Sequence, residues 1–356
     1  MAKIIDLVEK LERGRVRCQA CQRECIISDQ QLGFCLSRQN INGILYSLDH
    51  GQITGIQADP IEKKPFYHFK PGSTVATIGS WGCNFRCKQC LNYAHSWGTL
   101  ATENLKELAK ANLEKRQPEH ALTPQEIAKT IADADYPGIA FSYNEPVIWA
   151  EFAAETAKAF KKLKKEGFAV FVTNGSWTQE TIDLLAPHID AANIDIKGFC
   201  EETYKKMGAR LGIIPEMAEY AQKKGIFLEL TTLLIPTIND DPDEVKALAN
   251  WIVNKIGPET PWHLSQYDPN LAPDSAFRKI PTTPVATLEK AAEIGQEAGL
   301  SHIYIWAPTS ACTRSNMICP GCRQTVITRI GWQPTSIKIN PNGHCQFCNY
   351  KLNIIL

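Results

Sequence analysis

The amino-acid sequence predicts an α/β fold in which parallel strands alternate with helices as a partial (β/α)6-type barrel. Short apolar runs, of which 75–78 is the first, alternate with longer segments whose apolar residues recur at helical spacing. Strands that alternate with helices form a parallel sheet, and about six repeats fall short of the eight of a complete barrel. Cysteine groups lie before, within and after this region. We therefore expect a cysteine-rich N-terminal extension over 1–73, a barrel over 74–308 and a zinc-ribbon-like C-terminal module over 309–356.

The composition is that of an ordinary globular protein: 356 residues, 44% hydrophobic and 21% charged, with 38 basic and 38 acidic side chains. A net charge of zero gives no support for nonspecific binding to nucleic acid or to an anionic membrane. The N-terminus lacks the apolar core of a signal peptide, and no apolar run approaches the roughly 18 residues of a membrane helix. We expect a cytoplasmic protein, in which the 13 cysteines serve as metal ligands rather than as disulfides.

The N-terminal extension opens with apolar residues between Ile4 and Leu11 at helical spacing, which predicts a short helix. Four cysteines follow and predict a site for zinc or for an auxiliary iron–sulfur cluster: Cys18, Cys21, Cys25 and Cys35. Thiol ligands alone do not separate these two metals, and the alternative is four unligated cysteines. Residues 41–74 predict hairpins and loops that lead into the first barrel strand.

The loop after that first strand carries three cysteines at C-x3-C-x2-C spacing: Cys83, Cys87 and Cys90. Three thiolates on one loop can hold three irons of a cubane cluster and leave the fourth iron open for chemistry. A structural zinc would need a fourth ligand, which this loop does not offer. The alternative is three buried apolar cysteines, but the polar residues Asn84, Arg86 and Lys88 argue against it. The spacing therefore predicts a [4Fe-4S] cluster with one open iron.

The barrel strands and helices follow in order. The predicted strands are 75–78, 138–143, 169–173, 191–197, 227–235, 262–267 and 302–305. The predicted helices between them are 148–163, 178–186, 242–256 and 288–298. Pro242 at the start of the third helix and Gly257 after its end are helix start and stop signals.

The strand 191–197 alternates strictly between apolar and polar residues. Ala192, Ile194 and Ile196 share one face, and Asn193, Asp195 and Lys197 share the other. The outer face of a barrel strand lies under helices and must be apolar, so the polar face points into the barrel. This predicts a polar ligand inside the barrel, and the alternative is a buried Asp–Lys pair that serves only the structure.

The C-terminal module carries two C-x2-C pairs around a hairpin-like stretch, 325–339, and this spacing is typical of a zinc ribbon. The four predicted zinc ligands are Cys319, Cys322, Cys345 and Cys348. Zinc binding can supply roughly 10–16 kcal/mol, which is enough to fold a small module with little core. No dense basic patch accompanies these cysteines, so nucleic-acid binding is not expected. The remaining two cysteines, Cys200 and Cys312, stand alone as ordinary thiols.

Five further segments match a known family. They are Asp59–Pro65 and Tyr67–Ser73 before the three-cysteine loop, and Tyr143–Pro146, Thr173–Gly175 and Asp195–Gly198 after it. Together with the loop, they resemble the radical S-adenosylmethionine (SAM) enzymes of the AmmeMemoRadiSam system, which are relatives of the pyruvate formate-lyase activating enzymes. The resemblance covers nearly the whole chain.

The resemblance implies a [4Fe-4S] cluster that cleaves SAM reductively to a 5′-deoxyadenosyl radical, which abstracts hydrogen from an unidentified substrate. It also implies an electron donor such as flavodoxin or ferredoxin, and it suggests Memo-like and AMMECR-like proteins as partners. Two other functions stay open. One is a glycyl-radical activating enzyme that acts on a protein glycine, and the other is a non-catalytic metal-cluster scaffold.

The resemblance further implies which residues contact SAM. The implied contacts are Gln89 and Leu91 in the cluster loop and Asn144, Glu145, Thr173, Asn174, Asp195, Lys197 and His263 at the strands. Glu145 would meet the methionine ammonium, since a carboxylate matches its charge, and Asp195 and Lys197 would lie near the ribose and the carboxylate. For His263 the alternative is a histidine that only serves the core.

The sequence departs from the family pattern at several positions. Gln89 replaces the usual aromatic residue before the third cysteine, and Leu91 replaces the glutamine that usually follows that cysteine. Later segments differ at Gln266, Asp268 and Trp306, and residues 97–121 look inserted. These changes leave the predicted iron ligands untouched and affect the adenine pocket and the substrate.

Overall fold

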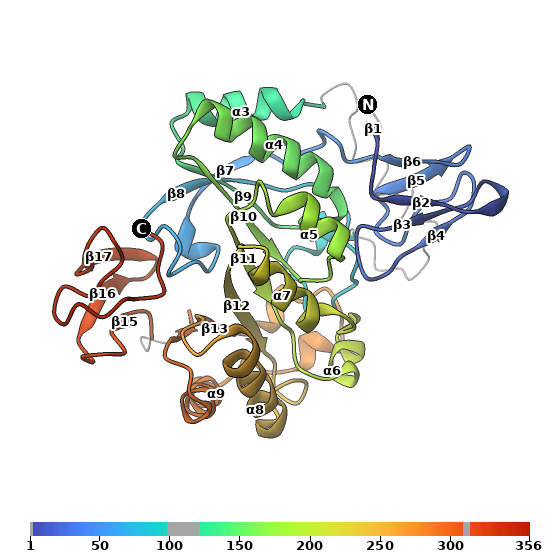
Figure 1. The fold of residues 1–356 in the computed structure, drawn as a ribbon. Helices are drawn as coiled ribbons and strands as arrows, with labels where there is room; N and C mark the ends of the chain where they lie inside the picture. The colour runs from blue at the N-terminus through green and yellow to red at the C-terminus, as the bar shows by residue number, and fades with distance from the viewer. Residues whose placement is uncertain (1–2, 98–120, 309–313) are drawn as a thin grey trace.

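The computed structural model describes residues 3–97, 121–308 and 314–356. Its centre is one eight-stranded sheet in the order β14-β13-β12-β11-β10-β9-β8-β7 (Figure 1). The parallel strands are β8 (Thr74–Ile78), β9 (Gly138–Phe141), β10 (Phe168–Thr173), β11 (Ala191–Asp195), β12 (Phe227–Leu234), β13 (Trp262–Gln266) and β14 (Ile303–Trp306). Antiparallel β7 (Ile56–Pro60) pairs with β8 at one edge. All the predicted barrel strands are confirmed, and their sequential order gives the open barrel.

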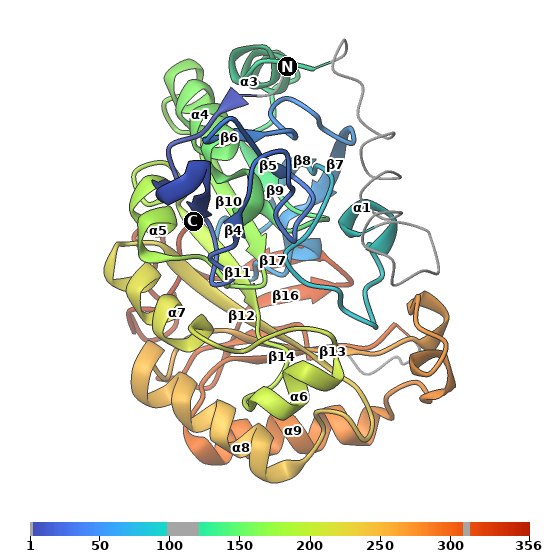
Figure 2. The same cartoon turned by 90° about the vertical axis from the view of Figure 1, so that its right-hand side faces the viewer.

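Helices connect the parallel strands, and the longer ones cover the outer face of the sheet (Figures 1 and 2). They are α1 (Tyr93–Ser96), α3 (Pro124–Asp133), α4 (Ala150–Leu163), α5 (Gln179–Leu185), α6 (Glu201–Lys206), α7 (Ile214–Lys223), α8 (Pro242–Trp251) and α9 (Val285–Ala298). α8 continues directly into a π-helical turn, Ile252–Ile256. This turn ends at Gly257, where φ is 135°. The predicted start and stop signals of this helix are therefore confirmed.

Two apolar cores lie on opposite faces of the sheet. The larger core contains Ala192, Ile194 and Ile196 and is shared with the covering helices, whereas the smaller core contains Ala191 with Phe66 and Phe69. The rings of Phe66 and Phe69 pack with strand residues that face the inside of the barrel: Val75, Ala140, Val170 and Ala191. On the inner face, the Asn193 amide donates to the carbonyl of Pro65 at 2.8 Å. The predicted inward direction of the polar face of β11 is confirmed.

The predicted helix over residues 4–11 is wrong. The chain forms β1 (Lys3–Ile4) and β2 (Val8–Lys10) there. β2 pairs with β3 (Val16–Cys18), which pairs with β4 (Ile26–Ile27), and β1 pairs with the hairpin of β6 (Ile44–Ser47) and β5 (Arg38–Ile41). Ile5 and Leu7 are buried while Ile4 is exposed, so the burial period is two. Pairing with distant strands overrides a helical pattern this short.

The C-terminal module is a three-stranded antiparallel sheet of β15 (Met317–Ile318), β16 (Thr325–Ile330) and β17 (Gln333–Ile337). The predicted hairpin is confirmed. The module has its own apolar core and is joined to the barrel by Arg329, which donates to the carbonyl of Tyr67 at 2.6 Å. The chain end also pairs with the barrel, through the Phe69–Ile355 bridge.

The predicted domain division stays a prediction. The pairing of β7 with β8 favours a first boundary before residue 56.

Most of the predicted insertion over 97–121, and Cys312, lie outside the described residues. In the described part of the chain, every helix is too short or too polar to cross a membrane.

Candidate functional site

The three-cysteine loop begins where β8 ends, at the carboxyl edge of the parallel sheet. Cys83 and Cys87 are buried and Cys90 is half-buried. The fully buried Phe85 anchors the loop, and its N–H donates to the Cys83 sulfur at 3.4 Å. Gly82 has a φ of 89°, and a Cβ there would lie 2.4 Å from the carbonyl oxygen of Cys35. Only glycine allows this close approach of the loop to the N-terminal extension.

The thiols of this loop lie within electrostatic range of the predicted SAM contacts. Burial raises the pKa of Cys83, and the nearby Cys87 and Glu145 raise it further. Burial raises the pKa of Cys87 to about 12, although Lys197 opposes that shift. Thiols in this environment stay protonated until a metal displaces the proton. The loop and the ends of β9 and β11 therefore meet in one place.

Glu145 is the centre of a hydrogen-bond network beside the loop. Its Oε1 accepts from the Thr173 hydroxyl at 2.6 Å and from the Val147 N–H at 3.1 Å, and its Oε2 accepts from the Asn174 N–H at 2.8 Å. Burial raises the pKa of Glu145 to about 7, against the effect of these donors and of Lys197. A cationic group bound next to this carboxyl would favour its ionised form.

Asn84 connects this network to the cluster loop, and it was not among the predicted site residues. The Asn174 amide donates to Asn84 Oδ1 at 2.8 Å, and the Asn84 amide donates to Ser176 Oγ at 2.6 Å. The Cys83 thiol also approaches Asn84 Oδ1, at 3.9 Å. The available signal was a polar residue directly after the first cysteine, but its fully buried position follows from tertiary packing.

Asn144 joins the end of β9 to the same loop. Its Oδ1 accepts from the Ser80 N–H at 3.0 Å, and its amide donates to the Gly82 carbonyl at 3.1 Å. Both ends of the side chain are thus engaged by the backbone that precedes Cys83. This arrangement fixes the loop whether or not Asn144 also touches a ligand.

Asp195, the last residue of β11, forms an ion pair with Lys197 just beyond the strand, with Nζ and Oδ2 2.5 Å apart. Burial lowers the pKa of Lys197, but Asp195 and Cys87 more than offset this and hold it above its ordinary value. The second oxygen, Asp195 Oδ1, is buried and accepts no hydrogen bond from the residues that the structure describes. The pair is therefore only partly satisfied.

The two predicted contacts in the cluster loop have different environments. Gln89 is buried, and its amide donates to the sulfur of Met207 at 3.5 Å. Its Oε1 is buried and has no donor among the described residues. Leu91 is 63% exposed, so it contributes little to any enclosed pocket.

His263 lies in a separate group on β13, next to the edge strand β14. Its Nε2 is 2.7 Å from Glu229 Oε2, and its ring stacks on Tyr304. Glu229 also accepts from the backbone N–H groups of residues 67–69. The structure brings the other predicted strand residues toward the cluster loop but places His263 against this buried carboxylate, which favours the structural alternative.

The C-terminal cysteines converge on a point. The four sulfur atoms all lie within 4.8 Å of one another, and the distances are 3.7 Å for Cys319–Cys348 and 3.8 Å for Cys322–Cys345. Sulfurs at ~2.3 Å from a tetrahedral zinc would lie about 3.8 Å apart. The observed arrangement therefore fits a single tetrahedral metal ion.

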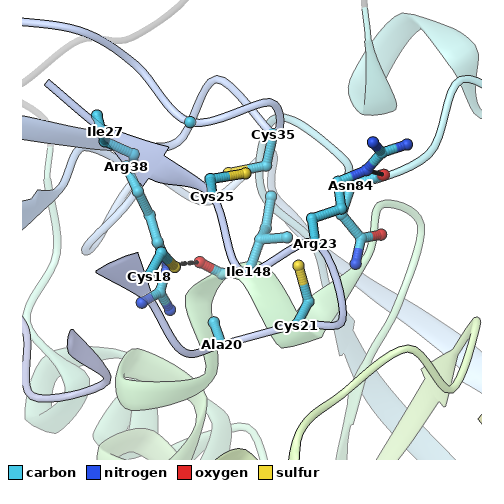
Figure 3. A pocket seen from close by; sticks show the side chains of 11 residues that line it. Cys18, Ala20, Cys21, Arg23, Cys25, Ile27, Cys35, Arg38, Asn84 and Ile148 are labelled. Carbon is cyan, nitrogen blue, oxygen red and sulfur yellow. Dashed lines mark hydrogen bonds between the residues drawn. The ribbon is translucent and has the colours of Figure 1, made fainter. Parts of the chain in front are cut away.

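The N-terminal cysteines lie around one cavity (Figure 3). Cys18, Cys21, Cys25 and Cys35 all contribute to its wall, together with Asn84 from the cluster loop. Among the residues that the structure describes, only the C-terminal group brings three or more sulfurs within the span of a single ion.

Comparison with known proteins gives consistent results. A family model described as the radical SAM superfamily matches residues 78–252. An uncharacterized protein of Methanocaldococcus jannaschii is 34% identical over 349 residues, which are 98% of this chain and 98% of that protein. The pyruvate formate-lyase-activating enzyme of Clostridium pasteurianum is 23% identical over 174 residues, covering 49% of this chain and 67% of that enzyme.

A third relative is the (2S)-3-sulfopropanediol dehydratase activating enzyme of Klebsiella oxytoca, which is 27% identical over 124 residues, or 34% of this chain and 38% of that enzyme. The family match spans the three-cysteine loop and the strands β9, β10, β11 and β12. With the open parallel barrel and the cysteine loop at its carboxyl edge, these findings show that the chain is an enzyme and belongs to the radical SAM superfamily.

Proposed function

We propose that the protein cleaves SAM reductively and abstracts a hydrogen atom from a substrate still to be identified. One observation carries the proposal: at the carboxyl edge of the sheet, Cys83 lies within electrostatic range of Glu145, and Cys87 and Cys90 lie within electrostatic range of Asp195 and Lys197. A [4Fe-4S] cluster bound there would supply the single electron that converts SAM to methionine and a 5′-deoxyadenosyl radical. The chain itself would bind SAM, orient it and exclude water.

The unsatisfied groups of the site fit the chemistry of SAM. Asp195 Oδ1 and Gln89 Oε1 are buried acceptors without donors in the described part of the chain. An unsatisfied buried acceptor is destabilising, so a hydrogen bond from a ligand donor to either oxygen would be favourable. SAM carries donors of the required kind in its ribose hydroxyls, adenine amino group and ammonium group. We propose that Glu145 and Asp195 accept from such groups, and that Lys197 and Asn174 hold these carboxylates in place.

A second candidate function is activation of another enzyme by hydrogen abstraction from a protein glycine. The similarity to the pyruvate formate-lyase-activating enzyme favours it. The resemblance to the AmmeMemoRadiSam system instead favours a different substrate and Memo-like and AMMECR-like partners. In either case we propose a protein donor of the flavodoxin or ferredoxin class. A non-catalytic scaffold would bind the metals without cleaving SAM.

We also propose zinc as the metal of the C-terminal module. The two sulfur–sulfur distances match a tetrahedral thiolate site, and closed four-cysteine sites of this kind are structural. The module has a small apolar core of its own, so the metal would supply much of its stability.

Electron paramagnetic resonance tests the main proposal. We expect the anaerobically reconstituted and reduced protein to show a cluster signal that changes when SAM is added. The variant Cys83→Ala/Cys87→Ala/Cys90→Ala should lose every SAM-responsive signal, and Cys200→Ser, which changes an exposed cysteine outside the three cysteine groups, should keep it. A parent signal that SAM leaves unchanged would contradict binding of SAM at this cluster.

A further inference from the structure

The cavity in the N-terminal extension is formed largely by sulfur and hydrocarbon. Its wall includes all four cysteines of the extension together with Arg23, Arg38 and Asn84 (Figure 3). Cys18, Cys21 and Cys35 are each less than a tenth exposed. Four thiols around one cavity, with no carboxylate or histidine in the wall, suit a metal group that prefers sulfur ligands.

The two four-cysteine groups of this chain differ in their spacing. In the C-terminal module the sulfurs lie within 4.8 Å of one another, which is the span of a single ion. In the N-terminal extension, all of whose residues from 3 to 73 are described, no three of the sulfurs meet that limit. Thiolates that each bind a different iron of a cluster stay further apart than thiolates that share one ion. The wider spacing therefore favours a cluster over zinc.

We propose that Cys18, Cys21, Cys25 and Cys35 hold a second iron–sulfur cluster, which passes one electron to the cluster at Cys83, Cys87 and Cys90. Four thiolates leave no iron open, so this cluster would transfer electrons and would not bind SAM. The metal site stands on its own geometry, whereas the electron transfer rests on the proposed function.

Cationic side chains around the cavity suit an anionic cluster. Arg38 is buried and lies close enough to Cys18 and Cys35 to interact with their charges, while its guanidinium also forms a two-point pair with Glu151 at 3.1 and 2.7 Å. Arg23 lies over the Phe34 ring, 3.5 Å from its centre, and interacts with the charges of Cys21, Cys25 and Cys83. A cluster with four thiolates carries net negative charge, which nearby guanidinium groups can offset.

Asn84 lies between the two cysteine groups. Burial raises the pKa of Cys21 to about 12, and a hydrogen bond with the Asn84 side chain opposes that shift. On the other side, the Cys83 thiol approaches the same side chain at 3.9 Å. A single amide thus separates one ligand of each predicted cluster.

Contacts to backbone groups also hold the N-terminal extension against the cluster loop. Ser37 Oγ donates to the Trp81 carbonyl at 3.0 Å, and the Cys35 carbonyl lies against Gly82. Arg86 from the cluster loop donates to the Phe34 carbonyl at 2.5 Å. The N-terminal extension therefore packs directly on the loop that would hold the SAM-binding cluster, and an electron could pass between them without a mobile carrier.

The electron transfer balances with one named reductant. A protein donor of the flavodoxin or ferredoxin class gives one electron to the N-terminal cluster, which passes it to the SAM-binding cluster and returns to its oxidised state. At the N-terminal cluster no bond forms or breaks, and its cysteine ligands keep their thiolate form throughout.

The N-terminal metal site is tested in a variant that lacks the ligands of the SAM-binding cluster and keeps all four N-terminal cysteines. The full-length variant Cys83→Ala/Cys87→Ala/Cys90→Ala, reconstituted anaerobically, should retain about two to four iron atoms per chain with matching sulfide. Adding Cys21→Ser and Cys25→Ser to that variant should remove this iron. An iron-free triple variant that instead contains two zinc ions per chain, or a disulfide among the N-terminal cysteines, would overturn the proposal.

The electron transfer is tested with Cys21→Ser/Cys25→Ser alone. With a small chemical reductant the variant should form 5′-deoxyadenosine within about twofold of the parent rate, because its SAM site is unchanged. With reduced flavodoxin or ferredoxin the rate should fall about tenfold or more. Equal rates for variant and parent with the protein donor would overturn the relay. If the parent cleaves no SAM, the iron content of the triple variant still decides the metal site.

Discussion

At the scale of single residues, Glu145 is the centre of the hydrogen-bond network beside the cluster loop and the proposed acceptor for the SAM ammonium. It accepts from Thr173, Val147 and Asn174 and lies close to the charge of Cys83. Glu145→Gln removes the negative charge and places amide hydrogens against these donors. A charge-assisted hydrogen bond contributes ~1.5–3 kcal/mol, so SAM should bind roughly ten- to a hundredfold more weakly.

SAM titration of the reduced protein, with iron measured alongside, checks this prediction. Glu180→Gln is a matched control, because Glu180 is an exposed residue in the first turn of α5. The control should bind SAM like the parent. Parent-like binding by Glu145→Gln would place the ammonium site elsewhere.

Asp195 supports a second prediction at the residue scale. Its Oδ2 is paired with Lys197, and its Oδ1 is buried without a donor among the described residues. Asp195→Asn should weaken SAM binding to an extent comparable with Glu145→Gln, while the iron content stays at the parent level. If both variants bind SAM like the parent, these polar groups serve only the structure of the barrel interior.

The sequence supported some residue assignments better than others. The spacing of Cys83, Cys87 and Cys90 and the alternation along β11 are local properties, so both could be read without a fold. The position of Asn84 between Cys21 and Cys83, and the contact of His263 with Glu229, arise from residues far apart in the chain. Neither the position of Asn84 nor the contact of His263 can be predicted from a local sequence pattern.

At the scale of elements, the C-terminal module gives a prediction about metal content. The purified full-length protein should contain one zinc per chain, and Cys322→Ser/Cys345→Ser should remove it. Because the core of the module is small, the variant should become sensitive to proteolysis between residues 314 and 356. Cys200→Ser is the control, since serine can replace the Cys200 side chain as the N-cap of α6. A zinc-free variant with parent-like protease resistance would show that the metal is not structural.

The elements themselves were predictable where their pattern was long. The barrel strands and the helix that begins at Pro242 were correctly predicted, because strand–helix alternation and helix end signals reinforce each other. The segment Ile4–Leu11 was not, because a pattern of eight residues fits helix and strand about equally and pairing with β3 and β6 decided the outcome.

At the scale of the whole molecule, the barrel and the C-terminal module meet around buried histidines. His302 is buried next to His68, and burial lowers the pKa of His302 from 6.5 to about 4. The folded protein therefore binds fewer protons than the unfolded chain between these two pKa values. This stabilising contribution is complete above pH ~6.5 and is lost as the pH falls toward ~4.

The prediction is a difference between the parent and His302→Gln. From about pH 7 to about pH 5.5 the parent should lose about 1 kcal/mol more free energy of unfolding than the variant. Denaturant unfolding at both pH values, with zinc and iron content verified, measures the two losses. Equal losses in parent and variant would mean that His302 is not held neutral by the fold.

The central claim is that this radical SAM protein cleaves SAM at the cluster of Cys83, Cys87 and Cys90, and one measurement tests it most directly. The anaerobically reconstituted full-length protein is reduced and incubated with SAM, and 5′-deoxyadenosine and methionine are quantified over time. We expect the two products to form in equal amounts, and we expect Cys83→Ala/Cys87→Ala/Cys90→Ala to form neither. Formation of 5′-deoxyadenosine by this variant at the parent rate, or its absence from a parent protein that contains the reduced cluster, would contradict the claim.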